Sequence, residues 1–173
     1  ASAADERARV AMRPIRDQLE AFAARAKKAK FSLRAKGKSI LGEVDAAEVA
    51  ETIEAIEKVT KTRFPSALRA FYEIVGPVDF RPAPSEAEPP AAWAAFVRGP
   101  HFVAQPLKRA LRELKQRLRA NVGIPHALRD TVSLALEPDG LRVDLSVWTE
   151  DPAIEGEDAT LLAHLRATLA AWG

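Results

Sequence analysis

The sequence predicts an α+β domain in which helices pack on a mostly antiparallel sheet, with an extra helix at the N-terminus. Apolar residues recur every three or four positions in several separate stretches, a spacing typical of amphipathic helices. Residues 132–147 alternate between apolar and polar side chains around a turn, which predicts a β-hairpin. The 173 residues contain no internal repeat and suit a single domain.

Residues 1–42 are expected to form a helical, basic extension that packs on a domain of residues 43–173. Pro14 suits the first turn of a helix that reaches about residue 29, and the residues before it are expected to be frayed or loosely helical. The inward face of this helix consists of Ile15, Leu19, Phe22 and Ala26. Residues 31–41 alternate around a Lys-Gly-Lys turn, which favours a basic hairpin.

A unit of two helices and a strand is predicted over residues 45–80. Asp45 followed three positions later by Glu48 is a capping-box pattern, which begins the first helix. Ser66 is predicted to cap the second helix, and Gly76 to end it in the left-handed conformation. The apolar faces are Val49, Ile53, Ile56 and Val59 in the first helix, and Leu68, Phe71, Tyr72 and Val75 in the second.

The second half of the chain is expected to contain a long loop, two helices and the hairpin. Five prolines make residues 81–105 an irregular surface crossing, in which Trp93 and Phe96 are predicted to anchor the loop to the core. Pro106 begins the next helix. The core face of the last helix is Leu162, Leu165, Leu169 and Trp172.

Three stretches of the chain resemble the SUKH superfamily of bacterial immunity proteins, which is related to fungal cell-wall-synthesis regulators. They are Ile53-Glu54-Ala55-Ile56-Glu57 with Phe64-Pro65-Ser66-Ala67-Leu68-Arg69-Ala70-Phe71-Tyr72 and Val75-Gly76, then Phe102-Val103-Ala104-Gln105-Pro106-Leu107, then the ending from His164-Leu165-Arg166 to Trp172-Gly173. The resemblance covers residues 43–173, and residues 1–42 have no counterpart in it. It implies a SUKH-like fold and a protein that neutralises a toxin domain by occluding it.

Composition narrows the possible classes of protein. The chain has no cysteine, which excludes disulfides and thiolate chemistry. No apolar run approaches the roughly 20 residues that a bilayer requires, and no signal-peptide pattern is present. We therefore expect a cytoplasmic protein that makes no membrane contact, present as a monomer or weak dimer.

The patterns of common active sites are missing from the sequence. His101, His126 and His164 lie far apart without metal-ligand spacing, and His164 is expected on the solvent side of the last helix. There is no Gly-x-Ser-x-Gly elbow, and the segment 36–39 lacks the other glycine of a phosphate-binding loop. We therefore expect no enzyme activity, no catalytic residues, no metal and no cofactor.

One candidate surface is basic. Lys108, Arg112, Lys115 and Arg119 form a stripe along the helix that follows Pro106. Together with Lys27, Lys28, Lys30, Lys36 and Lys38, this stripe is able to contact phosphates. No aromatic residue interleaves with these charges, so nucleic acid is the less favoured partner and a solvated helix face the better interpretation.

The other candidate surface is acidic. Residues 1–129 carry a net charge of +9 and residues 130–173 one of −7, and these charges either compensate within the fold or meet oppositely charged partners. The proposed partner-binding residues are Asp144, Trp148, Glu150, Asp151 and Glu155. An aromatic residue among carboxylates suits a basic protein partner, but packing of Trp148 under its own loop is the favoured interpretation. A regulatory or scaffold module of the same fold, binding several host proteins, is the alternative function.

Overall fold

The computed structural model describes residues 3–60, 63–120, 131–137, 140–147 and 154–173, with side chains described for residues 3–59, 63–116 and 161–173. In chain order its elements, with short 3-10 and π turns labelled η, are α1 (Ala3–Lys28), η1 (Gly37–Ser39), α2 (Ala46–Thr60), α3 (Ser66–Ala70), η2 (Phe71–Val75), β1 (Val78–Phe80), η3 (Ala91–Trp93), α4 (Ala94–Arg98), β2 (Phe102–Ala104), α5 (Leu107–Ala120), β3 (Thr131–Glu137), β4 (Gly140–Val147) and α6 (Ile154–Ala171). None of the described helices is long and apolar enough to cross a membrane.

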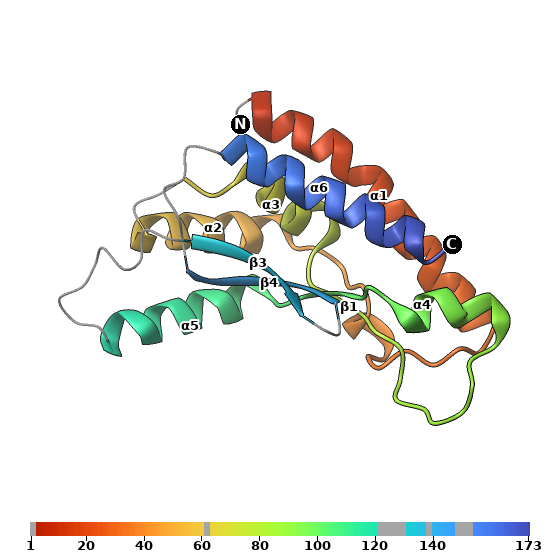
Figure 1. Cartoon of the computed structure of the whole chain (residues 1–173). Coiled ribbons are helices and arrows are strands. Elements are labelled where there is room, and N and C mark those ends of the chain that lie inside the picture. The colour runs from red at the N-terminus through yellow and green to blue at the C-terminus, as the bar shows by residue number, and fades with distance from the viewer. Residues whose placement is uncertain (1–2, 61–62, 121–130, 138–139, 148–153) are drawn as a thin grey trace.

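The sheet has the strand order β1-β2-β4-β3 and is mixed. β1 pairs with β2, and β3 with β4, in antiparallel fashion, whereas β2 and β4 are parallel. α1 and α6 run side by side on one side of the molecule, and α5 contacts β4 from the other (Figure 1). The α+β class and the 131–147 hairpin are therefore confirmed.

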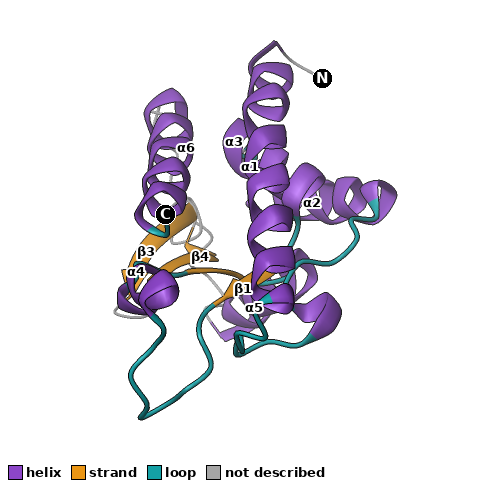
Figure 2. Ribbon diagram, turned by 90° about the vertical axis from the view of Figure 1, so that its right-hand side faces the viewer, coloured by secondary structure: helices purple, strands orange, loops and turns teal. Residues whose placement is uncertain are grey.

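The N-terminal helix belongs to the main hydrophobic core. Met12, Ile15, Leu19 and Phe22 are all at most 3% exposed and pack in the same cluster as the residues of α3 and β1. In the view of Figure 2, α1 runs down from the top of the molecule beside α3. Of the two expectations for the residues before Pro14, frayed or loosely helical, residues 3–13 follow the helical one: Ala8 and Met12 extend the buried face, and the helix begins at Ala3, so Pro14 lies inside it and not in its first turn.

Polar side chains of α1, among them Asp5 and Arg16, hold the helix to the 63–76 region. The buried carboxylate of Asp5 accepts a hydrogen bond from the Ser66 hydroxyl at 2.6 Å and another from Arg63 at 3.0 Å. Further along α1, the Arg16 guanidinium donates to the carbonyls of Ile74 and Val75 at 3.0 Å. The prediction that Ser66 caps α3 was wrong, because its hydroxyl bonds the Asp5 carboxylate instead and Pro65 is the N-cap.

The start of α2 and the end of η2 follow the sequence patterns. The Asp45 carboxylate accepts hydrogen bonds from the backbone N–H groups of Ala47 and Glu48 at 3.1 and 3.2 Å, which confirms the cap. Gly76 has the expected positive φ of 81°, but its ψ of −171° lies outside the left-handed helical region. This combination is accessible essentially to glycine alone.

The predicted basic hairpin over residues 31–41 does not form. Its backbone groups pair with β1 and the residues after it: Arg34 N–H donates to Arg81 O at 2.9 Å and Asp79 N–H to Ile40 O at 3.1 Å. Isolated bridges join Leu33 to Pro82 and Leu41 to Val78. The segment therefore runs along the free edge of β1, which the alternation in its sequence did not identify as a partner.

The loop between β1 and β2 is anchored by aromatic rings, as predicted. Phe96 is fully buried, and its ring lies 4.8 Å from that of Phe22 and 5.0 Å from that of Trp172. Trp93 stacks on Phe31 with ring centres 4.6 Å apart. The Trp172 indole N–H donates to Pro100 O at 2.6 Å, which joins the end of α6 to the same loop.

Candidate protein-binding surfaces

The predicted acidic surface lies mainly outside the described residues. Trp148, Glu150 and Asp151 fall outside them, while Asp144 lies in β4 and Glu155 in the first part of α6, where side chains are not described. This surface therefore stays a prediction.

The predicted basic stripe follows α5. Lys108, Arg112 and Lys115 are exposed, whereas Leu107, Ala110 and Leu114 face the core, and Arg119 lies on the same helix beyond the described side chains. The stripe thus has the amphipathic arrangement that its spacing predicted.

The first lysine of this stripe is already engaged. Lys108 Nζ lies 2.8 Å from Glu48 Oε1 on α2. The hydrogen bond to Glu48 and the charges of Glu48, Glu51 and Asp45 raise the pKa of Lys108. A phosphate approaching this end of α5 therefore meets carboxylates beside the lysine, which weakens the case for a nucleic-acid surface here.

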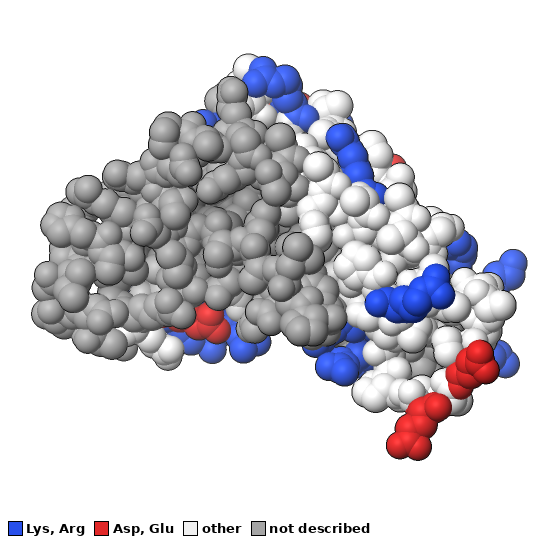
Figure 3. All heavy atoms as spheres, viewed as in Figure 1, with Lys and Arg blue, Asp and Glu red and all other residues white. Residues whose placement is uncertain are grey.

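The two sets of basic residues occupy different parts of the molecule. α5 and the C-terminal end of α1, which carries Lys27 and Lys28, lie at opposite ends of the view in Figure 1. Figure 3 shows that Lys and Arg are spread along the described part of the α1 side, with Asp and Glu gathered mainly at its lower edge. The expectation that both sets contact one phosphate backbone is therefore not supported by their placement.

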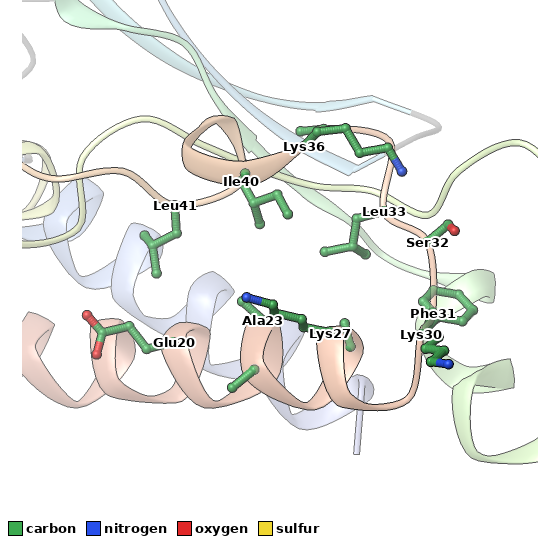
Figure 4. A pocket seen from close by; sticks show the side chains of 14 residues that line it. Glu20, Ala23, Lys27, Lys30, Phe31, Ser32, Leu33, Lys36, Ile40 and Leu41 are labelled. Carbon is green, nitrogen blue, oxygen red and sulfur yellow. The ribbon is translucent and has the colours of Figure 1, made fainter.

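A groove lies between the second half of α1 and residues 31–41, and we call it the α1 groove. It has a volume of about 620 Å³. Its lining residues are Glu20, Ala23, Ala24, Ala26, Lys27, Lys30, Phe31, Ser32, Leu33, Ala35, Lys36, Gly37, Ile40 and Leu41. Leu33, Ile40 and Leu41 point toward α1 across the gap, so its floor is apolar (Figure 4).

Three lysines are among the residues that line this groove. Lys27, Lys30 and Lys36 are all exposed, and none has an ion-pair partner among the described residues. The Lys27 side chain lies along the gap between α1 and Ile40, so its stem covers the floor (Figure 4). Glu20 is the acidic member of the lining, and its carboxylate accepts a hydrogen bond from Arg16 Nε at 2.8 Å. The groove therefore carries a net positive potential.

Lys30 takes an unusual backbone conformation at the end of α1. Its φ is +55°, and it is the non-glycine residue with positive φ among those described. Phe31 N–H donates to Ala26 O at 2.9 Å and Lys30 N–H to Lys27 O at 3.1 Å, which is the bonding of a Schellman motif with Lys30 at its C′ position. This turn sends the chain back along α1 and so creates the groove.

The α1 groove was not predicted as a site, although a signal for it exists. Residues 21–42 contain seven Lys or Arg and no Asp or Glu. From sequence, the lysines among them were assigned to a surface able to contact phosphates, which was the less favoured interpretation. The missing information was the pairing of residues 31–41 with β1, which brings Ile40 and Leu41 over α1.

The described histidines have structural contacts. His101 Nε2 lies 2.7 Å from Phe96 O, and its ring packs against the Phe96 ring. The expectation for His164 was wrong, because this residue is only partly exposed and its Nε2 is buried without a hydrogen-bond partner among the described residues. His126 lies outside the described residues. No cluster of three potential metal ligands occurs in the described part of the chain.

Comparison of this chain with known proteins found no similar protein. No family model, no curated protein and no solved structure matches this chain. The class that the fold defines is therefore α+β, and the SUKH resemblance stays a prediction.

Proposed function

We propose that this chain has a SUKH-like fold and acts in the cytoplasm as an immunity-type protein, binding a toxin domain and neutralising it by occlusion. The observation that carries the proposal is that the three stretches resembling the SUKH superfamily meet in one core. Phe71 of the first packs on Phe102 of the second, with ring centres 5.4 Å apart. Tyr72 O–H donates to Gln105 O at 2.6 Å.

The third stretch joins the same core from the C-terminus. Leu165 and Trp172 are 2% and 4% exposed, and the Trp172 ring lies 5.8 Å from that of Phe80. Residues that carry the resemblance therefore serve packing, which leaves the surface free to differ between partners. Occlusion requires only a complementary surface of this kind, and the bound toxin domain supplies the rest of the interface.

The direct test is rescue of growth. The chain is co-expressed with each toxin gene found beside its own, and the complex is sought by affinity purification and size-exclusion chromatography. We expect rescue of growth by the chain and a complex with one toxin domain, with Phe71→Asp as the control that loses both through unfolding. Absence of rescue and of any toxin complex would refute the proposal. Recovery of several host proteins without rescue would favour the regulatory or scaffold module instead.

A further inference from the structure

We infer that the α1 groove binds an acidic segment of a partner protein, which inserts one apolar side chain between flanking carboxylates. This inference deepens the proposed function and rests on it for the identity of the partner as a toxin domain. Its physical basis is the combination of an apolar floor with lysines among the residues that line the groove.

The apolar floor of the groove determines which kind of partner side chain can enter it. Leu33 is buried, while Ile40 and Leu41 are partly exposed and point toward α1 across the gap (Figure 4). An aromatic or aliphatic side chain that enters the groove leaves water and displaces the stem of Lys27. A single well-buried anchor of this type commonly supplies much of the affinity of an interface.

The lysines that line the groove determine the charge that a partner must carry. Seven basic residues and no acidic residue occur between positions 21 and 42, and the nearby Glu20 is bonded to Arg16. Carboxylates placed on either side of the anchor complement Lys27, Lys30 and Lys36, and they raise the rate of encounter. A basic partner is disfavoured at this groove by the same charges.

Lys30 supplies an independent argument. The C′ position of a Schellman motif, with its positive φ, is best suited to glycine. The dipole of α1 favours lysines in its last turn. It does not explain why a lysine stands at the C′ position, where a side chain is strained. Strain of this type is commonly retained at functional sites. We interpret Lys30 as a charge kept at the groove in spite of its conformational cost.

A nucleic acid fits the groove less well. Proteins that bind single strands offer aromatic faces on which bases stack. Phe31 is the aromatic residue of the lining, and its ring is already stacked on Trp93 with an interplanar angle of 6°. Phosphates gain nothing from the aliphatic floor made by Ile40 and Leu41. We therefore commit to an acidic protein segment.

The test is a selection of random 12-residue peptides on the purified full chain, followed by affinity measurements on the enriched peptides by fluorescence anisotropy. The groove variant is Lys27→Glu with Lys36→Glu. The matched control is Arg112→Glu with Lys115→Glu, which makes the same change of charge on exposed positions of α5. Circular dichroism and urea denaturation establish that each variant is folded.

We expect enriched peptides that carry an aromatic or aliphatic residue flanked by Asp or Glu. Their affinity falls by about tenfold or more in the groove variant and by less than about threefold in the control. Lys30→Gly also weakens binding while raising the urea midpoint, which separates a lost contact from a damaged fold. A 20-nucleotide single strand and dodecanoate serve as competitors and are expected not to displace the peptide.

Several results would overturn the inference: no enrichment, enriched peptides without acidic residues, equal binding to the groove variant, or displacement by the oligonucleotide or the fatty acid. The same variants in the growth assay separate the two proposals. If the variant Lys27→Glu with Lys36→Glu still rescues growth, the groove is not the toxin-binding site, and the proposed function is unaffected. If the unsubstituted chain does not rescue growth, the proposed function is refuted, whereas the result of the peptide selection still stands.

Discussion

Replacement of Gly76 by alanine tests whether the Val-Gly pair of the SUKH resemblance is a structural requirement. Gly76 ends η2 with φ +81° and ψ −171°. A Cβ atom built on it lies 2.9 Å from Cγ2 of Val44, closer than carbon atoms approach in folded proteins. The substitution therefore meets two separate obstacles, one in the backbone and one in the packing against Val44.

The magnitudes of the two obstacles can be estimated separately. The backbone conformation costs about 1–3 kcal/mol for a residue with a side chain. Relief of the contact with Val44 by a shift of packed neighbours costs about 1–3 kcal/mol more. We expect Gly76→Ala to lower the free energy of unfolding by about 2–6 kcal/mol, a large share of the 5–15 kcal/mol that is typical of a domain.

Urea denaturation followed by circular dichroism measures these changes, and Gly37→Ala is the internal control. Gly37 has φ +56° but no atom within 4 Å of its Cβ position. Gly37→Ala should therefore lower the free energy of unfolding only by the cost of the backbone conformation, about 1–2 kcal/mol. In the background Val44→Ala, the cost of Gly76→Ala should fall because the close contact is gone. Equal losses for Gly76→Ala and Gly37→Ala would refute the reasoning.

Three further changes probe other parts of the same framework. Lys30→Gly should raise the free energy of unfolding by about 1 kcal/mol, because glycine takes the positive φ without strain, and an unchanged or lower value in urea denaturation would contradict this. Ser66→Ala should lower it by about 1–3 kcal/mol, because the buried Asp5 carboxylate loses its 2.6 Å bond, and a loss no larger than that of an exposed serine would contradict the role of this pair. Tyr72 is the one tyrosine of the chain, and burial raises its pKa, so the unfolded state ionises first: stability is complete below about pH 10 and is lost as the pH rises further. Absorbance at 295 nm should show ionisation only together with unfolding, and a titration of folded protein near pH 10 would refute this.

Local patterns predicted the elements well because their causes lie within a few residues. Asp45 caps α2 through N–H groups two and three positions away, and the α+β class followed from spacing alone. Phe96 was predicted to anchor its loop because a large apolar ring in a proline-rich surface loop usually packs into the core. These inferences needed no knowledge of which elements pack together.

The errors involve partners that are distant in the sequence. Ser66 has a good capping side chain, but its hydroxyl finds the Asp5 carboxylate 61 residues away. The 31–41 segment has a plausible hairpin pattern, but its backbone finds the edge of β1. Alternation of side chains indicates a strand without naming its neighbour. For the same reason the α1 groove was missed, since its floor exists only after that pairing forms.

The placement of the α1 groove bears on where selectivity resides. Every residue that lines it falls between positions 20 and 41, within the 42 residues that have no counterpart in the SUKH resemblance. The same segment is fixed to the resembling part by Arg16, which bonds the carbonyls of Ile74 and Val75, and by the buried pair of Asp5 and Ser66. These bonds hold α1, and with it the backbone at Lys27, against the rest of the core. We therefore expect substitutions in the N-terminal extension, more than those in residues 43–173, to change which acidic segment this protein binds.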